Sequence, residues 1–600
     1  MNIEALQRDY RNGVSSPTEI VRQVYSRIRS QGEHPVWIEL VSETESLARA
    51  AALEASGDIS SMQLFGIPFA VKDNFDVSGM RTTAACPEFS RGAEETAEAV
   101  QRLLDAGAIL IGKTNMDQFA TGLVGTRSPY GICRSVFNPA YISGGSSSGS
   151  AVAVASGLVS FSLGTDTAGS GRVPAAFNQL VGVKPTRGLV STHGLLPACR
   201  TLDCVSIFAE TCADALCVLD VISGPDPKDP YSRVATPGEG ASPWLASSFR
   251  FGIPTESSLE FFGDEASRDC YLRAVQALVN LGGEPVTFSY DPFREAASLL
   301  YNGPWVAERL AAIKPFFDTN VDSLEPTVGK IIRGALRFSA VDAFTSQYKL
   351  QQLRRSVSEV MQKVDFLLLP TTATTYTVQE VQTDPIETNS RLGFYTNFVN
   401  LLDLAAVAVP AELKENGLPF GVSLIGEAFS DFALIAVADR LHRSLSITLG
   451  GSKRLLAETK PCALDGTTSG CVLMAVVGAH LTGQPLNWQL RSRRARFVKT
   501  VRSHVDYRLY VLPNSTPAKP GLVFDPGYAG EGIELEVWAM PEDTLGSFLR
   551  AIPSPLCLGT ILLSDATQVK GFLCEPAGIA GAREITHLGG WRAYLESMQS

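Results

Sequence analysis

The first part of the chain repeats hydrophobic residues at the spacing of a helix. Ile, Val and Tyr side chains recur every three or four residues between Thr18 and Ile28. Ser16, a residue type that favours a helix N-cap, precedes them. We therefore expect most of the first 60 residues to form helices.

Short apolar runs of strand length then alternate with helical patterns. We expect, in chain order, a strand over 65–71, a helix over 96–106, a strand over 108–111, strands at Val181 and over 366–369, and a helix over 433–445. An apolar segment over 151–163 is expected to be a further core element. Alternation of this kind predicts an α/β architecture with a largely buried sheet.

The pattern changes near residues 450–470, where turn-forming residues dominate. From Cys471 onward, short β-like runs are separated by loops rich in Pro and Gly. A chain of 600 residues also exceeds what one hydrophobic core normally serves. We expect a first domain over 1–455, a linker over 456–470 and a smaller, mainly β domain over 471–600.

Composition and charge narrow the possible functions. Hydrophobic residues make up 45% of the chain and the net charge is −11, which argues against a nucleic-acid or membrane-surface binder. A basic run over 491–502 contains only Phe497 as a stacking platform, so we expect solvated surface, an intersubunit contact or a site for anionic intermediates there. Eleven cysteines and six histidines show no metal-ligand spacing, and the N-terminus shows no secretory signal. The expectation is a cytoplasmic protein without a metal or cofactor and without a membrane span.

Two clusters of Gly and Ser carry the candidate chemistry. SGGSSSGSA (143–151) contains Ser146, GTDTAGSGR (164–172) contains Ser170, and Lys72 lies upstream at the end of an expected strand. Backbone amides, hydroxyls and one lysine suffice for acyl transfer without histidine. Taken singly, such clusters are usually turns, and a lysine beside Asp73 is usually a surface ion pair. Their joint occurrence favours catalysis.

These motifs, with FGIPFAVKDNF (65–75), resemble the amidase signature family over roughly residues 20–450. The resemblance implies an α/β/α sandwich around a mixed sheet. It also implies a triad in which Ser170 is the nucleophile, Ser146 is the bridging serine of a cis peptide, and Lys72 is the base. A buried lysine can serve as a base because desolvation favours its neutral form.

The residues before Ser170 are candidates for the oxyanion hole. Backbone N–H groups of Thr167, Ala168 and Gly169 would stabilise the tetrahedral intermediate. Ala168 departs from the glycine more usual in the family, which would trim the pocket. Asp166 and Arg172, on either side of this loop, are expected to be a structural clamp.

Within the family, residues 115–131 and 301–313 resemble the allophanate hydrolase subfamily. The resemblance implies a small anionic amide as substrate, held by Arg309 and Tyr301, with Gly122 lining the pocket. Guanidinium suits a planar carboxylate. Pro304 would begin the helix that carries Arg309. The alternative places Arg309 beside Glu308 on a solvated helix face.

The segment 471–600 resembles the C-terminal domain of this subfamily, which is similar to a γ-glutamylcyclotransferase-like barrel. VVGAHLTGQPLN (476–487) would be its first strand and turn. In the family the domain is linked to breakdown of N-carboxycarbamate, and His480 could donate a proton or hold that anion. A structural histidine is the alternative.

The implied reaction is hydrolysis of allophanate to ammonia and N-carboxycarbamate, and finally to two ammonia and two carbon dioxide, in urea degradation. The resemblance also implies a homodimer and functional coupling to a biotin-dependent urea carboxylase, here expected to be a separate polypeptide. The alternatives are the glutaminase subunit of a tRNA amidotransferase, a broad-specificity amidase, and a non-catalytic scaffold that uses the fold for binding.

Overall fold

The computed structural model describes residues 1–598 except 33, 58, 60–61, 235–248, 446–447, 452–453, 460, 463–470, 492, 494 and 514. Its described residues form two compact units, one within 1–462 and one within 471–598. Leu456 and Cys462, in the expected linker, are buried in the core of the first unit. The first unit therefore extends to at least Cys462, and residues 463–470 of that linker lie outside the described residues.

The N-terminal segment is helical, as its hydrophobic spacing predicts. Helices α1 (Ile3–Arg11) and α2 (Pro17–Ser30) precede the short strand β1 (Trp37–Leu40) in the chain, and α3 (Glu43–Ser56) follows it. Helix α2 begins with a capping box, in which the Ser16 side chain accepts from the Glu19 N–H and the Glu19 side chain accepts from the Ser16 N–H. This reciprocal pairing satisfies two N–H groups at the start of the helix.

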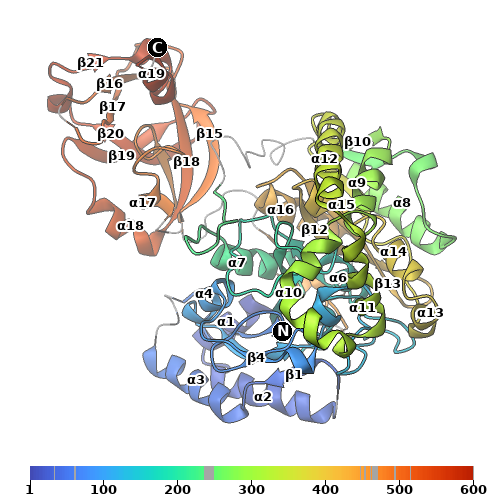
Figure 1. Ribbon diagram of the computed structural model, residues 1–600. Coiled ribbons are helices and arrows are strands. Elements are labelled where there is room, and N and C mark those ends of the chain that lie inside the picture. The colour runs from blue at the N-terminus through green and yellow to red at the C-terminus, as the bar shows by residue number, and fades with distance from the viewer. Residues whose placement is uncertain are drawn as a thin grey trace. The chain divides into compact units, whose positions relative to one another are not determined.

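One sheet of eleven strands forms the centre of the first unit (Figure 1). Across the sheet the strands are β1, β5 (Ile109–Thr114), β2 (Pro68–Lys72), β6 (Phe161–Asp166), β8 (Cys204–Ala209), β7 (Val181–Lys184), β12 (Ala405–Leu413), β13 (Pro419–Gly426), β11 (Phe366–Pro370), β9 (Phe249–Pro254) and β10 (Gly283–Phe288). Strand β2 is parallel to both β5 and β6, whereas β6 is antiparallel to β8. The sheet is therefore mixed.

Alternate residues of the central strands enter two different cores. In β11, Phe366 and Leu368 belong to one buried cluster, whereas Leu367 and Leu369 belong to another. Helices α7 (Cys212–Ile222), α8 (Glu265–Asn280) and α16 (Asp431–Leu445) contribute to the first cluster, and α9 (Asp291–Asn302), α12 (Ala340–Met361) and α15 (Phe398–Leu401) to the second. Both faces are thus covered by helices, which confirms the predicted α/β/α sandwich.

Further elements of the first unit connect these layers. They are β3 (Arg81–Thr82), β4 (Arg91–Gly92), α4 (Glu98–Asp105), α5 (Ser148–Ala155), α6 (Arg172–Phe177), α10 (Val306–Asn320), α11 (Pro326–Arg333), α13 (Val378–Thr383) and α14 (Glu387–Leu392). The apolar segment over 151–163, expected to be one element, contains most of helix α5 and the start of strand β6. Its periodicity could not reveal the turn because nearly every position is buried on all sides.

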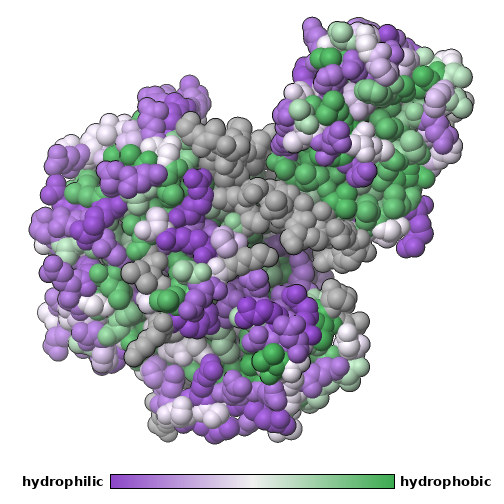
Figure 2. All heavy atoms as spheres, turned by 180° about the vertical axis from the view of Figure 1, so that it is seen from behind, coloured by the Kyte–Doolittle hydropathy of each residue, from purple (hydrophilic) through white to green (hydrophobic). Residues whose placement is uncertain are grey.

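The second unit is mainly β, as predicted. A five-stranded sheet has the order β15 (Arg496–Arg502), β18 (Glu534–Pro541), β14 (Cys471–Val476), β20 (Gln568–Cys574), β19 (Leu556–Leu562), and a three-stranded sheet the order β17 (Pro520–Phe524), β16 (Tyr507–Val511), β21 (Arg583–Glu584). Helices α17 (Trp488–Arg491), α18 (Glu542–Leu549) and α19 (Trp591–Ser597) complete it. Figure 2 shows hydrophobic residues gathered in a broad patch on one face of this unit.

The motif expected to form the first strand and turn of this unit is nearly all loop. Strand β14 ends at Val476, so residues 477–487 follow the strand instead of forming it. The prediction placed the strand too late because the apolar run VLMAVV continues across the strand end without a polar break.

Candidate active site

The two parallel strands β2 and β6 bring the candidate residues to one edge of the sheet. Val71 pairs with Leu163, so Lys72 at the end of β2 lies beside the last residues of β6. The loop that follows β6 carries Ser170 and leads into helix α6. Because the carboxyl ends of parallel strands meet at the same edge, residues almost 100 positions apart become neighbours.

Lys72 is fully buried and donates to two hydroxyl groups. Its Nζ atom lies 2.8 Å from Oγ of Ser146 and 2.8 Å from Oγ1 of Thr165. Burial lowers the pKa of the Lys72 ammonium to about 7, although the carboxylates of Asp117, Asp203 and Asp166 oppose this shift. Near neutral pH a substantial fraction of Lys72 is therefore an uncharged amine.

Ser146 links Lys72 to Ser170. The Oγ atoms of the two serines are 3.0 Å apart, and the peptide bond between Gly145 and Ser146 is cis. Ser170 Oγ also lies 3.4 Å from the carbonyl oxygen of Gly122. Asp73, the alternative partner considered for Lys72, pairs instead with the buried Lys113, at 3.0 Å. The structure thus brings the three predicted triad residues into one hydrogen-bonded row.

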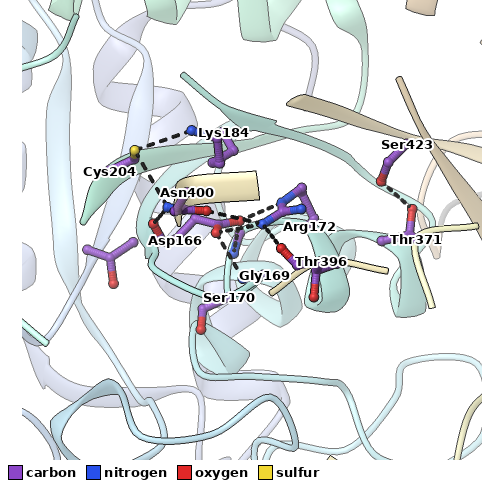
Figure 3. A network of polar contacts seen from close by, with 12 residues as sticks. Asp166, Gly169, Ser170, Arg172, Lys184, Cys204, Thr371, Thr396, Asn400 and Ser423 are labelled. Carbon is purple, nitrogen blue, oxygen red and sulfur yellow. Dashed lines mark hydrogen bonds and ion pairs between the residues drawn. The ribbon is translucent and has the colours of Figure 1, made fainter. Parts of the chain in front are cut away.

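A buried ion pair lies behind the loop that carries Ser170 (Figure 3). Arg172 donates to both carboxylate oxygens of Asp166, at 2.9 and 3.0 Å, and neither side chain is exposed. Arg172 also donates to the carbonyl of Thr396, and Asn400 donates to the carbonyl of Asp166 at 2.7 Å. This network holds the ends of the loop together and does not reach Ser170 Oγ.

The Gly169 N–H differs from those of the other two predicted oxyanion-hole residues, because it already has a protein acceptor. It donates to Asp166 Oδ1 at 2.9 Å. In the part of the chain that the structure describes, the N–H groups of Thr167 and Ala168 have no protein acceptor. Gly169 has another reason to be glycine: a Cβ atom there would lie 2.4 Å from Oγ1 of Thr396.

A loop over 117–127 shapes the space beside Ser170. Asp117 accepts from the N–H groups of Val124, Gly125 and Arg127 at 2.9–3.2 Å, so one buried carboxylate holds the whole turn. Gly122, with a φ of 156°, presents its carbonyl to Ser170. The Gly122 carbonyl thus lies beside the Ser170 hydroxyl, and its expected role in lining a substrate pocket stays a prediction.

Arg309 is buried inside the first unit, not on a solvated helix face. Its guanidinium donates to the Ala120 carbonyl at 3.1 Å and to Thr121 Oγ1 at 3.2 Å, next to Gly122. Its other terminal nitrogen lies 3.4 Å from the Tyr301 hydroxyl. Nearby acidic groups and Tyr301 raise the pKa of Arg309 against the effect of burial. The loop over 117–127 therefore connects the cation to Ser170.

The helix that carries Arg309 begins later than predicted. Helix α10 starts at Val306, and Trp305 is its N-cap. Pro304 lies in the preceding turn, where its carbonyl accepts from the Ala307 N–H at 2.8 Å.

Three polar residues of the site were not found from the sequence. Thr165 contacts Lys72, Asp117 holds the loop over 117–127, and Asp203 accepts a hydrogen bond from the Thr167 hydroxyl. Asp117 and Thr165 lie inside motifs that were recognised, but nothing in the residue types distinguished them. Asp203 stands alone in the sequence, and only the pairing of β8 with β6 brings it to the site.

His480 lies in the second unit, in a separate pocket of about 150 Å³. Its ring stacks on Phe572, with 4.9 Å between the centroids, and its Nε2 lies 3.0 Å from Oε1 of Gln489. Burial lowers the pKa of His480 below its ordinary value. Lys519 lines the same pocket among mostly apolar residues.

The described residues offer neither a metal site nor a membrane span. No group of three or more His, Cys, Asp and Glu side chains among them could hold a metal ion. No helix among them is long and apolar enough to cross a membrane.

Comparisons with known proteins match both units. The amidase family model matches residues 19–435, and the model of the allophanate hydrolase C-terminal domain matches residues 472–596. A urea amidolyase from Saccharomyces cerevisiae is 42% identical over 98% of the chain, which spans 32% of that relative's length. A glutamyl-tRNA(Gln) amidotransferase subunit from Streptococcus gordonii is 33% identical over 69% of the chain and 91% of its own length.

The whole chain also matches a solved structure. The allophanate hydrolase of Kluyveromyces lactis is 42% identical, with a TM-score of 0.74 over 99% of both chains. The amidase match covers more than half of the chain and contains Lys72, Ser146 and Ser170. This chain therefore belongs to the amidase family and has an allophanate hydrolase C-terminal domain.

Proposed function

We propose that the chain hydrolyses allophanate through an acyl-enzyme on Ser170. The observation that carries this proposal is the buried row Lys72–Ser146–Ser170, together with the cation Arg309 of α10, which is hydrogen-bonded to the neighbouring loop over 117–127. The match to an allophanate hydrolase over 99% of both chains supports the same substrate.

In the proposed mechanism, a proton leaves Ser170 as its oxygen attacks the terminal amide carbonyl. The proton passes to Ser146, and the Ser146 proton passes to neutral Lys72. In the structure, Lys72 donates to Ser146, and Ser146 donates to Ser170. For the proton transfer both hydroxyls must rotate, so that Ser170 donates to Ser146 and Ser146 donates to the neutral amine of Lys72. The protons return to the leaving nitrogen, ammonia departs, and water cleaves the acyl-enzyme to N-carboxycarbamate.

Substrate binding would combine one cation with backbone donors. Arg309 would hold the carboxylate of allophanate, with Tyr301 beside it and Gly122 lining the pocket. The N–H groups of Thr167 and Ala168 would stabilise the developing oxyanion. Because Arg309 is buried, its charge acts in a medium where water screens it weakly.

The decisive experiment measures ammonia release from allophanate, malonamate, glutamine and a neutral amide with the full chain. We expect hydrolysis of the two anionic amides, and loss of it in Ser170→Ala. Hydrolysis of allophanate by Ser170→Ala would refute the mechanism. Preference for glutamine would instead support the alternative that the Streptococcus gordonii relative suggests, a glutaminase subunit.

We propose a second step in the C-terminal unit, the breakdown of N-carboxycarbamate in the pocket of His480. The pocket combines apolar walls with Lys519 and a histidine whose lowered pKa favours the neutral ring. In the full chain, His480→Asn should leave the first ammonia unchanged and slow the release of carbon dioxide. If both products appear at the wild-type rate, His480 is structural.

We also propose that the chain is a homodimer. Val341, Phe344 and Tyr348 form an exposed apolar stripe along one face of α12. Phe344→Lys should convert a dimer to a monomer in light scattering, whereas the exposed polar substitution Gln351→Lys should not. A wild-type chain that is monomeric at micromolar concentration would refute the proposal.

Coupling to a biotin-dependent urea carboxylase is a further proposal. A relative named urea amidolyase is about three times as long as this chain, which supports a functional link between the two activities. Adding a urea carboxylase with urea, bicarbonate and ATP should let the chain release ammonia from urea. The cytoplasmic location expected from the sequence stays a prediction.

A further inference from the structure

Asp203 has a buried carboxylate that serves two segments at once. It accepts from the N–H groups of Ala198 and Cys199 at 2.8 and 3.2 Å, and from the hydroxyl of Thr167. Asp203 is 5% exposed. The carboxylate therefore joins the loop over 198–203 to the loop that carries Ser170.

The same loop is attached to the helix of Arg309. Thr201 donates through its N–H and its hydroxyl to the two carboxylate oxygens of Glu308, at 3.0 and 2.6 Å. Cys199 Sγ lies 3.5 Å from the Trp305 carbonyl, at the start of α10. The loop over 198–203 thus bridges the proposed oxyanion donors and the proposed substrate cation.

We propose that Asp203 is a positioning residue that acts through Thr167. By holding the Thr167 side chain, it fixes the direction of the Thr167 and Ala168 N–H groups and keeps them aligned with the helix of Arg309. The inference rests on the proposed function, because these N–H groups matter only if Ser170 forms an acyl-enzyme. A charged acceptor holds a hydroxyl more firmly than a neutral one.

The alternative is that Asp203 only closes the turn at Ala198 and Cys199. The two roles differ in what they predict. A turn brace would affect stability, whereas a residue that aims oxyanion donors would affect kcat while KM changes little. The reason is that the oxyanion exists only in the transition state and in the intermediate that resembles it.

The test uses three variants in the full chain: Thr167→Val, which removes the hydroxyl and keeps the shape, Thr167→Ser, which keeps the hydroxyl, and Asp203→Asn. We expect Thr167→Val and Asp203→Asn each to lower kcat about 10- to 100-fold. Thr167→Ser should stay near wild type, and the double variant Thr167→Val, Asp203→Asn should fall no further than either single variant. Sulfonylation of Ser170 by phenylmethanesulfonyl fluoride should be slower in Thr167→Val, Asp203→Asn and the double variant than in wild type and Thr167→Ser.

Retention of wild-type kcat by Thr167→Val would overturn the proposal, as would losses that multiply in the double variant. If Asp203→Asn does not fold, the comparison of Thr167→Val with Thr167→Ser decides the matter. An error in the proposed substrate would be distinguishable from an error in the proposed role of Asp203. In that case the wild type would hydrolyse another amide instead of allophanate, and the Thr167 variants could be read on that amide and on the sulfonyl probe.

Discussion

Nζ of Lys72 lies 2.8 Å from Oγ of Ser146, and neither residue has exposed surface. The amine is therefore close enough to exchange a proton with the hydroxyl. Burial lowers the pKa of Lys72 and so sets the fraction of the amine that is neutral and able to accept that proton. This relationship makes the site dependent on pH.

We predict that kcat/KM rises with pH and levels off above about 7. The pKa of Lys72 in the folded chain is lowered to about 7, so the amine is protonated and inactive as a base below that value. A pH–rate profile between 5.5 and 9 measures the midpoint. Lys72→Arg should lower kcat by about 100-fold or more at every pH, because guanidinium stays protonated. The exposed substitution Lys314→Arg is the control, and a flat profile in the wild type would contradict the assignment.

Arg309→Leu should raise KM for allophanate and malonamate and leave KM for a neutral amide nearly unchanged. Losing a charge-assisted hydrogen bond to the substrate corresponds to an increase of about 10- to 100-fold. Steady-state kinetics on paired substrates measure it, with the exposed Arg333→Leu on α11 as the control. Equal losses on anionic and neutral amides would show that Arg309 only supports the loop over 117–127.

Asp166→Asn should destabilise the first unit by about 3–5 kcal/mol, because it leaves the buried Arg172 without its counter-charge. Chemical denaturation followed by Trp fluorescence measures the loss. The exposed pair Arg29–Glu43 is the matched control, and Glu43→Gln should change stability by less than about 1 kcal/mol. Similar effects at the two sites would contradict a structural role for the buried clamp.

Gly122→Ala should lower both stability and activity. A Cβ atom there would lie 2.7 Å from Oδ2 of Asp117, and the φ of 156° is one that side chains rarely adopt. We expect a loss of about 1–3 kcal/mol from backbone strain. Gly334→Ala, where a Cβ would meet nothing within 4 Å, is the control for thermal shift and kcat. An active, fully stable Gly122→Ala would mean that the loop can move away.

His442→Leu should stabilise the first unit, and more so at acidic pH. The imidazole is fully buried, and neither ring nitrogen has a hydrogen-bond partner among the described residues. Burial lowers the pKa of His442 to about 3, whereas the unfolded side chain titrates near 6.5. The unfolded state therefore binds the extra proton, and stability falls by about 1.4 kcal/mol per pH unit as pH drops below 6.5.

Denaturation of wild type and His442→Leu at pH 7.5 and pH 5 tests this expectation. The advantage of the variant should grow by about 2 kcal/mol between the two conditions. The exposed substitution Arg333→Leu in the same unit removes no group that titrates in this range and should give no such growth. An advantage that is the same at both pH values would show that His442 finds a partner in solution.

The sequence by itself determined the fold class, the presence of a smaller β unit after the α/β unit, and the identity of Lys72, Ser146 and Ser170 as candidates. It could do so because hydrophobic spacing reports burial locally, and because the lysine and the two Gly and Ser clusters occur together in the order of one family's motifs. It also singled out Arg309, but left its environment open between a solvated face and a pocket.

Only the tertiary structure decided which groups touch. Thr165 and Asp203 reach the site because β2, β6 and β8 lie side by side in the sheet. The spacing of hydrophobic residues within a strand does not predict which strands pair with each other. The Gly169 N–H donates to Asp166, three residues away, whereas the N–H groups of Thr167 and Ala168 have no acceptor among the described residues. Buried backbone groups need partners, and the residue types alone do not tell which acceptor the folded loop brings to each N–H group.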